Sequence, residues 1–519
     1  MEKEFGESFI LKPRDYQKAI YETCKDKDCL VVLPTGTGKT LIAIMMTTHR
    51  FKKFPLEKIL VLAPTRPLIE QHLESFKKNL SEGWADMQIF TGKTPAGKRK
   101  EIWQTAEIVF STPQCISNDL KKGLYNLEDV SLLVVDECHR CLKNYAYNYV
   151  AQSYKKDSVN RRILGMTASP GSDKEVISQV CKNLGIEAVE VRTRESTDVK
   201  PYLQELEFEK VEVDFPSEME EIRTLLQEIE RDKINEMKNR GILIGSGSKV
   251  MLLKIQNRLM NELKRSRDFN KMLGVSACAQ ALKISHAIEL IETQTISSLV
   301  EYLRGLYKQA EERKSKGIQR LVKDLRFSKA YTLATTFGRE HPKVYALKEI
   351  VEKQFEKNPK SKIIVFAQFR ETVRKLASEL EKMNGIKTGI FVGQAIKKHG
   401  KETTGLKQKE QKEMVKKFSE GEINVLVATS IAEEGLDIPE VSMVIFYEPI
   451  PSAIRNIQRR GRTARLAPGS LKILVTKNTR DQIYHYAAYH KERRMHSAID
   501  QIKKDLDNGK GFAEEQSKL

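Results

Sequence analysis

The chain has 519 residues, and its 89 Lys and Arg outnumber its 70 Asp and Glu, which gives a formal net charge of +19. Compact apolar runs exclude a fully disordered chain, and no run approaches the roughly 18 apolar residues of a membrane span, so no membrane partner is expected. The charge favours a polyanion such as nucleic acid as partner, although a solvated Lys- and Glu-rich surface would have the same composition. Seven scattered cysteines and the lack of a secretory signal predict a cytoplasmic protein with reduced thiols.

Short apolar runs alternate with amphipathic stretches over residues 27–205, as a parallel α/β sheet requires. The predicted strands of this region are Cys29–Leu33, Ile59–Leu62, Met87–Phe90, Ile108–Phe110, Leu132–Val135, Arg162–Gly165 and Ala188–Val191. The same alternation returns over residues 340–480, with predicted strands Lys362–Phe366, Thr388–Val392, Val425–Ala428, Met443–Phe446 and Leu471–Thr476. The sequence therefore predicts two α/β domains of similar size.

The segment between these two regions has a different pattern. Residues 217–329 contain no proline and repeat apolar residues at helical spacing, which predicts an all-helical insertion. Residues 238–329 carry 19 Lys or Arg against 8 Asp or Glu, which favours a contact with nucleic acid over a merely solvated face. The predicted boundaries are 1–205 for the first domain, 206–335 for the basic insertion, 336–490 for the second domain and 491–519 for a C-terminal helix and tail.

A phosphate-binding loop follows the first predicted strand, at Thr35-Gly36-Thr37-Gly38-Lys39-Thr40. Its glycines allow successive backbone N–H groups to face phosphate oxygens, and the N-terminus of the following helix adds positive charge. We expect Lys39 to reach the β- and γ-phosphates of ATP and the Thr40 hydroxyl to bind Mg²⁺. Leu33 stands where the strict motif has glycine.

A carboxylate pair, Asp136 and Glu137, ends the strand predicted at 132–135. Asp136 is expected to hold the metal through water, and Glu137 to polarise the attacking water as general base. An isolated Asp-Glu pair is usually only a strand-end turn, but the upstream phosphate loop favours the catalytic interpretation. The neighbouring Cys138 and Cys141 lack a second pair at zinc-ligand spacing, so we expect no zinc there and take His139 as a polar contact between domains.

These two segments together resemble the ATP site of superfamily 2 helicases, and further motifs of that superfamily follow in order between about residues 10 and 480. Arg14 and Gln17 match the adenine-reading segment, and Thr167-Ala168-Ser169 matches the motif that couples hydrolysis to domain movement. The resemblance implies an α/β fold with two RecA-like parallel-sheet domains that bind ATP and Mg²⁺. It also implies contacts with the phosphates of a nucleic-acid strand at Thr65, Arg66, Thr91, Gly92, Thr112, Gln368 and Thr429.

The second domain contributes its own part of the ATP site by the same resemblance. Gly435 and Asp437 lie in a segment similar to motif V, and Gln458, Arg462 and Arg465 lie in one similar to motif VI. Arg462 and Arg465 would stabilise the charge that develops on the γ-phosphate, with Gln458 near that phosphate or its water. Because Lys39 and Arg462 belong to different domains, the site is complete only when the cleft closes, and ATP turnover would alternately grip and release the strand.

The insertion narrows the resemblance to the branch containing archaeal Hef, the Fanconi anaemia M-type translocases and the RIG-I-like RNA sensors. Residues 431–439 and 449–455 are most similar to Hef. This implies an ATP-dependent, nucleoid-associated DNA helicase or translocase that acts on forks, flaps and Holliday-type junctions in replication-fork repair. Lys264, Arg265 and Arg267 of the insertion would then contact branched DNA.

Hef-type proteins also carry an XPF-like nuclease, for which this chain is too short. We therefore expect either a fragment of a longer helicase-nuclease or a member without the nuclease, and partners such as a sliding clamp or repair proteins stay open. The alternative function is a double-stranded-RNA-activated ATPase of the RIG-I-like type, although the sequence shows no obvious flanking sensor domains. A scaffold with a vestigial ATP site is disfavoured because Lys39, Asp136, Glu137, Arg462 and Arg465 are all present.

Overall fold

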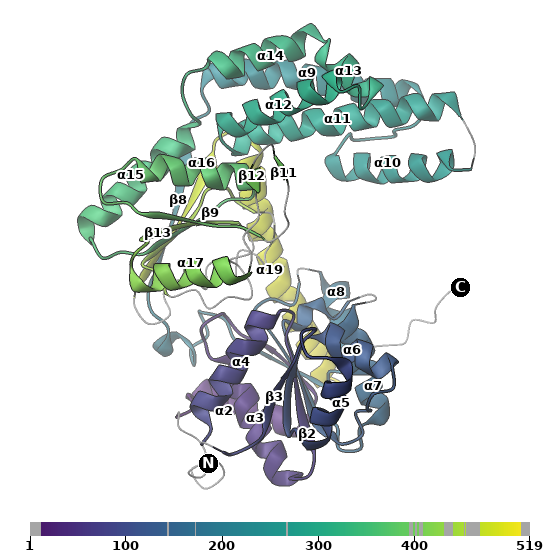
Figure 1. Cartoon of the computed structure of the whole chain (residues 1–519), viewed down its shortest axis with the longest axis vertical. Helices are drawn as coiled ribbons and strands as arrows, with labels where there is room; N and C mark the ends of the chain where they lie inside the picture. The colour runs from purple at the N-terminus through teal and green to yellow at the C-terminus, as the bar shows by residue number, and fades with distance from the viewer. Residues whose placement is uncertain are drawn as a thin grey trace.

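The computed structural model describes residues 12–81, 83–142, 145–171, 173–265, 268–393, 398–399, 402–403, 408–429, 440–450, 452 and 468–509. Figure 1 shows two domains that each contain a sheet and, beyond the second, a bundle of helices. The predicted fold class is confirmed, since both main sheets are parallel and the bundle is inserted between the two domains in sequence. No helix in these ranges is both long and apolar enough to cross a membrane.

The first sheet has seven parallel strands in the order β3-β4-β2-β5-β6-β1-β7. They are β1 (Cys29–Val32), β2 (Lys58–Leu62), β3 (Met87–Phe90), β4 (Ile108–Ser111), β5 (Val130–Asp136), β6 (Ile163–Thr167) and β7 (Ala188–Val191). The central strands are buried along their whole length, because helices cover both faces of a parallel sheet and make the strands apolar throughout. All seven predicted strands are therefore confirmed, with ends that agree to within two residues.

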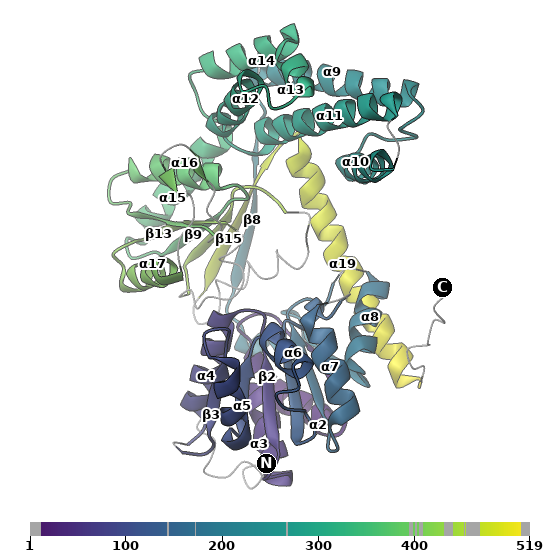
Figure 2. The same ribbon diagram turned by 45° about the vertical axis from the view of Figure 1, so that its right-hand side comes forward.

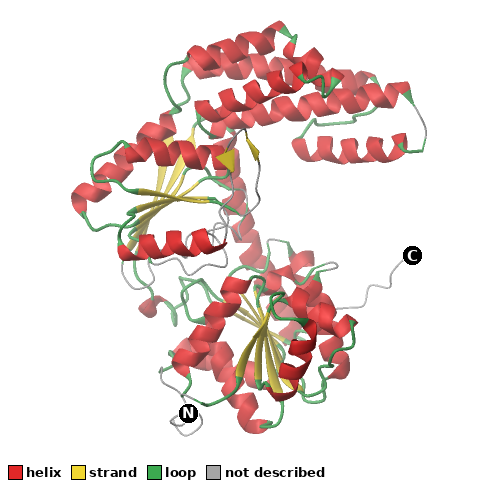
Figure 3. Cartoon of the chain, viewed as in Figure 1, coloured by secondary structure: helices red, strands yellow, loops and turns green. Residues whose placement is uncertain are grey.

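Two separate apolar cores lie on the two faces of this sheet. One face packs against α2 (Asp15–Asp26), α3 (Lys39–Lys53) and α4 (Arg66–Asn79). The other packs against α5 (Ala96–Thr105), α6 (Pro113–Lys121), α7 (Ala146–Asp157) and α8 (Lys174–Leu184). Short 3-10 turns stand at Cys138–Arg140 and Lys200–Tyr202. Figure 3 shows the resulting helix–sheet–helix layers.

The second sheet has six parallel strands in the order β10-β13-β9-β14-β15-β8. They are β8 (Leu206–Val213), β9 (Ile363–Phe366), β10 (Thr388–Phe391), β13 (Val425–Ala428), β14 (Met443–Phe446) and β15 (Gly469–Thr476). Helices α15 (Pro342–Lys357) and α16 (Arg370–Glu381) cover one face, and α17 (Gln408–Glu420) covers the other. A separate two-stranded hairpin pairs β11 (Lys398–His399) with β12 (Glu402–Thr403).

The predicted start of the insertion at residue 206 is wrong, because residues 206–213 form strand β8. It pairs with β15 over its full length and forms an edge of the second sheet. Its sequence, LEFEKVEV, largely alternates apolar and charged residues, and none of its residues is buried, which is the pattern of an edge strand. The second domain is therefore built from two separate stretches of chain, one on each side of the insertion.

The insertion is all-helical, as predicted. Its helices are α9 (Ser217–Asn239), α10 (Lys249–Leu263), α11 (Phe269–Thr293), α12 (Ile296–Glu311), α13 (Lys316–Val322) and α14 (Leu325–Thr336). One apolar core joins α9 and α11 to α12, α13 and α14, and a smaller core holds α10 against α9 and α11. In space the bundle packs on the second domain and lies away from the first (Figure 1).

A single long helix, α19 (Arg480–Asp507), runs from the insertion to the first domain (Figure 2). It begins beside the insertion, and its later residues Met495, Ile499 and Ile502 enter the apolar core of the first domain, with Lys174 of α8 2.9 Å from Asp505. The predicted boundary at residue 490 is therefore wrong, because it divides one continuous helix that contains neither proline nor glycine.

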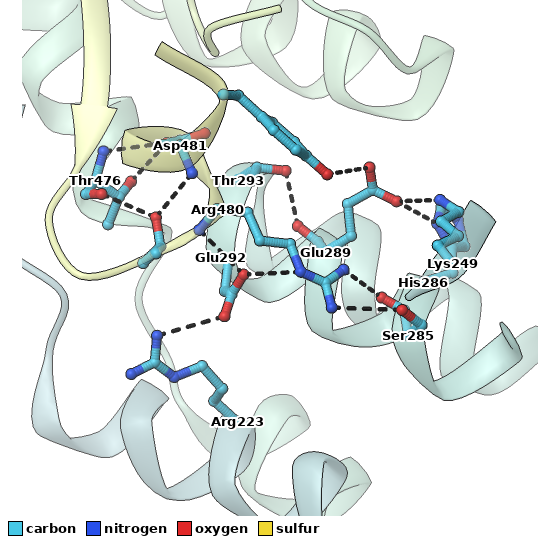
Figure 4. A network of polar contacts seen from close by, with 12 residues as sticks. Arg223, Lys249, Ser285, His286, Glu289, Glu292, Thr293, Thr476, Arg480 and Asp481 are labelled. Carbon is cyan, nitrogen blue, oxygen red and sulfur yellow. Dashed lines mark hydrogen bonds and ion pairs between the residues drawn. The ribbon is translucent and has the colours of Figure 1, made fainter. Parts of the chain in front are cut away.

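A buried polar network fixes the start of α19 to the insertion (Figure 4). Glu292 of α11 lies 3.4 Å from both the Arg223 guanidinium of α9 and the Arg480 guanidinium of α19. Arg480 also donates to the backbone carbonyl of Ser285 at 2.8 Å. Because these arginines and Glu292 satisfy one another, the charged groups can be buried between helices of different domains.

Candidate ATP site and nucleic-acid interface

The phosphate-binding loop lies between β1 and α3, at the carboxyl end of the first sheet. Gly38 precedes α3 with φ +79°, a left-handed conformation that favours glycine, and a Cβ there would stand 2.5 Å from Nε2 of Gln17. Lys39 is the first residue of α3, and its ammonium turns back to donate to the carbonyls of Leu33 at 3.0 Å and Pro34 at 3.4 Å. The first turn of α3, which includes Thr40, contains no acidic residue, so this helix end favours a bound anion.

The adenine-reading segment at the start of α2 contacts this loop directly. Gln17 donates to the carbonyl of Thr37 at 3.1 Å, and its Oε1 accepts from the backbone N–H of Arg14 at 2.8 Å. The hydroxyl of Tyr16 donates to the same Thr37 carbonyl at 2.6 Å, a contact that the sequence analysis missed. The structure thus brings Arg14 and Gln17 beside the loop, while contact with the base stays a prediction.

Asp136 is the last residue of β5, near the middle of the sheet, and its side chain is almost fully buried. Its Oδ2 accepts from Nε2 of His72 on α4 at 2.8 Å, and its backbone carbonyl accepts from the hydroxyl of Tyr147 at 2.8 Å. Burial alone would raise the pKa of Asp136, but the hydrogen bond and charge of His72 and the charge of Lys39 hold that pKa below its ordinary value. The carboxylate is therefore ionised at neutral pH.

Glu137 follows in a left-handed conformation, with φ +50°, which is unusual for a residue with a side chain. Its Oε2 lies 3.2 Å from Nδ1 of His139, and that nitrogen is 3.1 Å from Oγ1 of Thr167. The prediction that His139 is a contact between domains is contradicted by these partners, which both belong to the first domain. The reason is that β5 and β6 are adjacent, so the residues that end them lie side by side.

The donor set fits Mg²⁺ and does not fit zinc. Asp136 supplies an ionised carboxylate oxygen and Thr40 a hydroxyl oxygen, and oxygens of these two kinds are ligands that Mg²⁺ prefers. Cys138 and Cys141 are free thiols inside the apolar core, and burial raises the pKa of both. Within the described ranges, no group of three His, Cys, Asp or Glu side chains is placed to hold a metal ion.

The residues of the first domain that are predicted to contact a nucleic-acid strand lie together at the carboxyl edge of its β-sheet. Thr65 and Arg66 follow β2, Thr91 and Gly92 follow β3, and Thr112 follows β4, and these three strands are neighbours in the sheet. Asp136 ends the next β-strand, so its carboxylate and the predicted contacts with nucleic acid share the carboxyl edge of the sheet. Arg66 donates to Glu70 at 2.7 Å, and Glu70 also pairs at 2.6 Å with Lys412 of α17 in the second domain.

In the second domain, two residues predicted to contact nucleic acid also follow neighbouring β-strands. Gln368 follows β9 and is exposed, and Thr429 follows the adjacent β13 and is buried. In the insertion, Lys264 and Arg265 are exposed just beyond the end of α10. The remaining predicted residues lie outside the described ranges and stay predictions: Arg267, Gly435, Asp437, Gln458, Arg462 and Arg465.

His72 and Tyr147 are site residues that the sequence analysis did not find. Ile69, His72 and Phe76 are spaced three and four residues apart and are all buried on one side of α4. A histidine on the otherwise apolar face of an amphipathic helix was the available signal for a polar contact inside the domain.

Comparison with known proteins places this geometry in a family. The crystal structure of the Hef helicase domain from Pyrococcus furiosus matches with a TM-score of 0.70 and 44% sequence identity, over 92% of this chain and 98% of that one. The chain belongs to the Hef-type superfamily 2 helicases. Three family models match successive parts of this Hef-type chain: a DEAD/DEAH box helicase (14–177), a helical bundle named for ATP-dependent RNA helicases (218–341) and a helicase conserved C-terminal domain (342–467).

Curated relatives of the Hef-type chain are longer proteins. A Methanocaldococcus jannaschii protein named as an RNA helicase is 39% identical over 93% of the chain, which covers 60% of that protein. The ATP-dependent DNA helicase mph1 of Neurospora crassa is 32% identical over 91%, covering 42% of it. The mouse Fanconi anemia group M protein homolog is 32% identical over 94%, covering 26%. The chain thus carries the DEAD/DEAH box domain and the conserved C-terminal domain of helicases, and it spans less than two thirds of each of these proteins.

Proposed function

We propose that this Hef-type chain is an ATP-driven DNA helicase or translocase that acts on branched DNA such as forks, flaps and Holliday-type junctions. The observation that carries the proposal is the shared carboxyl edge of the first sheet, where the ionised Asp136 ends the β-strand next to that of Thr65 and two β-strands from that of Thr112. ATP chemistry and strand contact are then neighbours on one rigid sheet. The Neurospora crassa relative is named as a DNA helicase, and that name supports DNA as the polymer.

In the proposed mechanism, the N-terminus of α3 and Lys39 bind the phosphates, and the Lys39 ammonium exchanges its loop carbonyls for phosphate oxygens. Thr40 and Asp136 would hold Mg²⁺, which neutralises charge on the phosphates when bound. Glu137, held in its left-handed conformation beside His139, takes the proton of the attacking water. Arg462 and Arg465 of the second domain stabilise the charge on the γ-phosphate once the cleft closes.

Strand movement follows from closing and opening of that cleft. Arg66 is paired with Glu70, which also meets Lys412 of the second domain, so rearrangement between the domains reaches a predicted phosphate contact. Contacts from Thr65, Thr112 and Thr429 to phosphates carry no base preference, as a motor that moves along any sequence requires.

The test is steady-state ATP turnover against single-stranded DNA, duplex DNA, forked DNA and duplex RNA, with Lys39→Ala as the control. We expect forked DNA to stimulate turnover most strongly and Lys39→Ala to abolish it. Stimulation by duplex RNA alone would overturn the DNA proposal in favour of an RNA-activated ATPase. Turnover in Lys39→Ala equal to that of the unchanged protein would overturn the assignment of the ATP site itself.

The insertion is proposed to hold the branch, because Lys264 and Arg265 are exposed beyond α10 and the surrounding segment is strongly basic. Changing both residues to glutamate should weaken binding to forked DNA by roughly tenfold or more and flatten its salt dependence, since fewer phosphates are neutralised. Binding to a short single strand should change little. Equal losses on the two substrates, measured by fluorescence anisotropy, would contradict a junction-specific role.

A further inference from the structure

His72 makes a contact that the mechanism above does not use. Its Nε2 lies 2.8 Å from Oδ2 of Asp136, and each of the two residues is only 6% exposed. Because a carboxylate only accepts hydrogen bonds, the histidine nitrogen is the donor. The other ring nitrogen, Nδ1, is buried and has no hydrogen-bond partner among the described residues.

The unpaired Nδ1 favours a functional role for the hydrogen bond between His72 and Asp136 over a role in packing alone. A histidine retained for packing normally satisfies both ring nitrogens, because leaving one buried and unpaired costs free energy. Here His72 leaves Nδ1 unpaired while Nε2 is directed at the one carboxylate assigned to the metal. An apolar side chain at this place on α4 would remove the cost of the unpaired nitrogen and would lose only the contact with Asp136.

The position of His72 on α4 connects two sites. The helix begins at Arg66, next to Thr65, where the strand contacts are proposed. His72 follows Arg66 by six residues, which is about 9 Å along a rigid helix. Any displacement of α4 when its N-terminus binds phosphates therefore moves the group that holds Asp136.

We propose that His72 is a positioning residue that fixes Oδ2 of Asp136, leaves Oδ1 for Mg²⁺, and couples metal–nucleotide binding to strand binding through α4. This inference rests on the proposed function, which assigns Asp136 to the metal and Thr65 and Arg66 to the strand. Groups that hold a metal-binding carboxylate typically change metal affinity by about 10- to 100-fold when they are replaced.

Two polar substitutions separate the hydrogen bond from packing. The amide nitrogen in His72→Gln reaches about as far as Nε2, whereas the amide in His72→Asn falls short by one bond, about 1.5 Å. Asn79→Ala is the matched control, because Asn79 is another buried polar residue of α4, and it donates to the carbonyl of Ser75 in its own helix at 2.7 Å.

The first measurement is equilibrium binding of a fluorescent ADP analogue during a Mg²⁺ titration. We expect His72→Asn to raise the half-saturating Mg²⁺ concentration about tenfold, with unchanged affinity in EDTA. We expect His72→Gln and Asn79→Ala to stay within about twofold of the unchanged protein. A His72→Asn titration that coincides with that of Asn79→Ala, while Asp136→Asn loses its response to Mg²⁺, would overturn this inference alone. An unaltered response in Asp136→Asn would overturn the metal assignment of the proposed function, and this inference with it.

The second measurement is the affinity for a dT oligonucleotide with and without Mg²⁺ and a non-hydrolysable ATP analogue. The ratio of the two affinities reports the coupling between the sites. We expect His72→Asn to bring this ratio close to one and His72→Gln to preserve it, whereas Arg66→Ala should lower both affinities. A ratio in His72→Asn equal to that of the unchanged protein would overturn the coupling.

Discussion

Replacing Lys343 with methionine should destabilise the joint between the insertion and the second domain. The Lys343 side chain of α15 is fully buried, and its ammonium donates to Oδ2 of Asp481 at 2.7 Å and to the carbonyl of Thr293 at 2.6 Å. It also lies 4.7 Å from the centre of the Tyr447 ring. Methionine keeps the length of the aliphatic stem and removes only the charge and its hydrogen bonds.

The expected cost follows from what remains at Asp481. Removing one partner of a buried ion pair usually costs 3–5 kcal/mol, because the other charge stays buried. Asp481 keeps hydrogen bonds from the backbone N–H and the hydroxyl of Thr476, at 3.1 and 3.0 Å. Burial already raises the pKa of Asp481 against the attraction of Lys343, so the carboxyl is expected to take up a proton in the variant. We therefore expect a loss near the lower limit, about 3 kcal/mol.

The assay is urea unfolding with hydrogen exchange in peptides from α11 and α15, which reports the free energy of opening at this joint. Lys353→Met is the matched control, because Lys353 and Glu349 form a pair whose side chains are 70% and 64% exposed, and the loss of such a solvent-screened pair should change stability little. The double variant Lys343→Met/Asp481→Leu should recover much of the loss, since apolar groups can replace a buried pair. A Lys343→Met loss no larger than that of Lys353→Met would refute the reasoning.

Two further predictions concern the phosphate loop and the insertion. Gly38→Ala should weaken binding of a fluorescent ADP analogue about tenfold, because a Cβ at φ +79° is strained and meets Gln17, whereas Gly97→Ala, with open space around it, should bind as before. Burial alone would raise the pKa of Glu289, but hydrogen bonds from His286 and Lys249 outweigh burial and lower this pKa to about 2. The ionised Glu289 carboxylate therefore stabilises the fold fully above pH 4.5, and this stabilisation is lost as the pH falls towards 2. Glu289→Gln should therefore lower stability at pH 7 by on the order of 3 kcal/mol. In thermal unfolding the difference should shrink below pH 4, and a constant difference would contradict the explanation.

The sequence predicted those parts of the fold that depend on local pattern. Most of the predicted strands are buried along their whole length, so apolar runs such as Leu132–Val135 were sufficient to find them. Strand β8 was missed because an exposed edge strand with alternating charges has no apolar run. The boundary at residue 490 was wrong because a helix that crosses from one domain to another has no local mark at the crossing.

In the candidate ATP site, too, features with a local sequence pattern could be predicted and contacts between distant residues could not. Lys39 and Asp136 could be identified because the phosphate loop and the strand-end carboxylate are each contiguous in sequence. The contacts of His72 with Asp136 and of Lys412 with Glu70 could not be foreseen from the sequence. The first pair is separated by 64 positions along the chain and the second pair by 342. His139 was assigned to the wrong neighbour because its partner, Thr167, depends on which strand lies next to β5.

The two-part construction of the second domain has a consequence for how the chain folds as it leaves the ribosome. Strand β8 ends at Val213, but its partner β15 begins at Gly469, so the edge of the second sheet waits for about 250 further residues. At roughly 5–20 residues per second that wait lasts about 13–50 seconds. The first domain waits as well, because its apolar core is completed only by Met495, Ile499 and Ile502 of α19. Both motor domains therefore mature only after α19 has been synthesised, and a ribosome stalled before residue 469 would hold a chain with two unfinished cores exposed to chaperones and proteases.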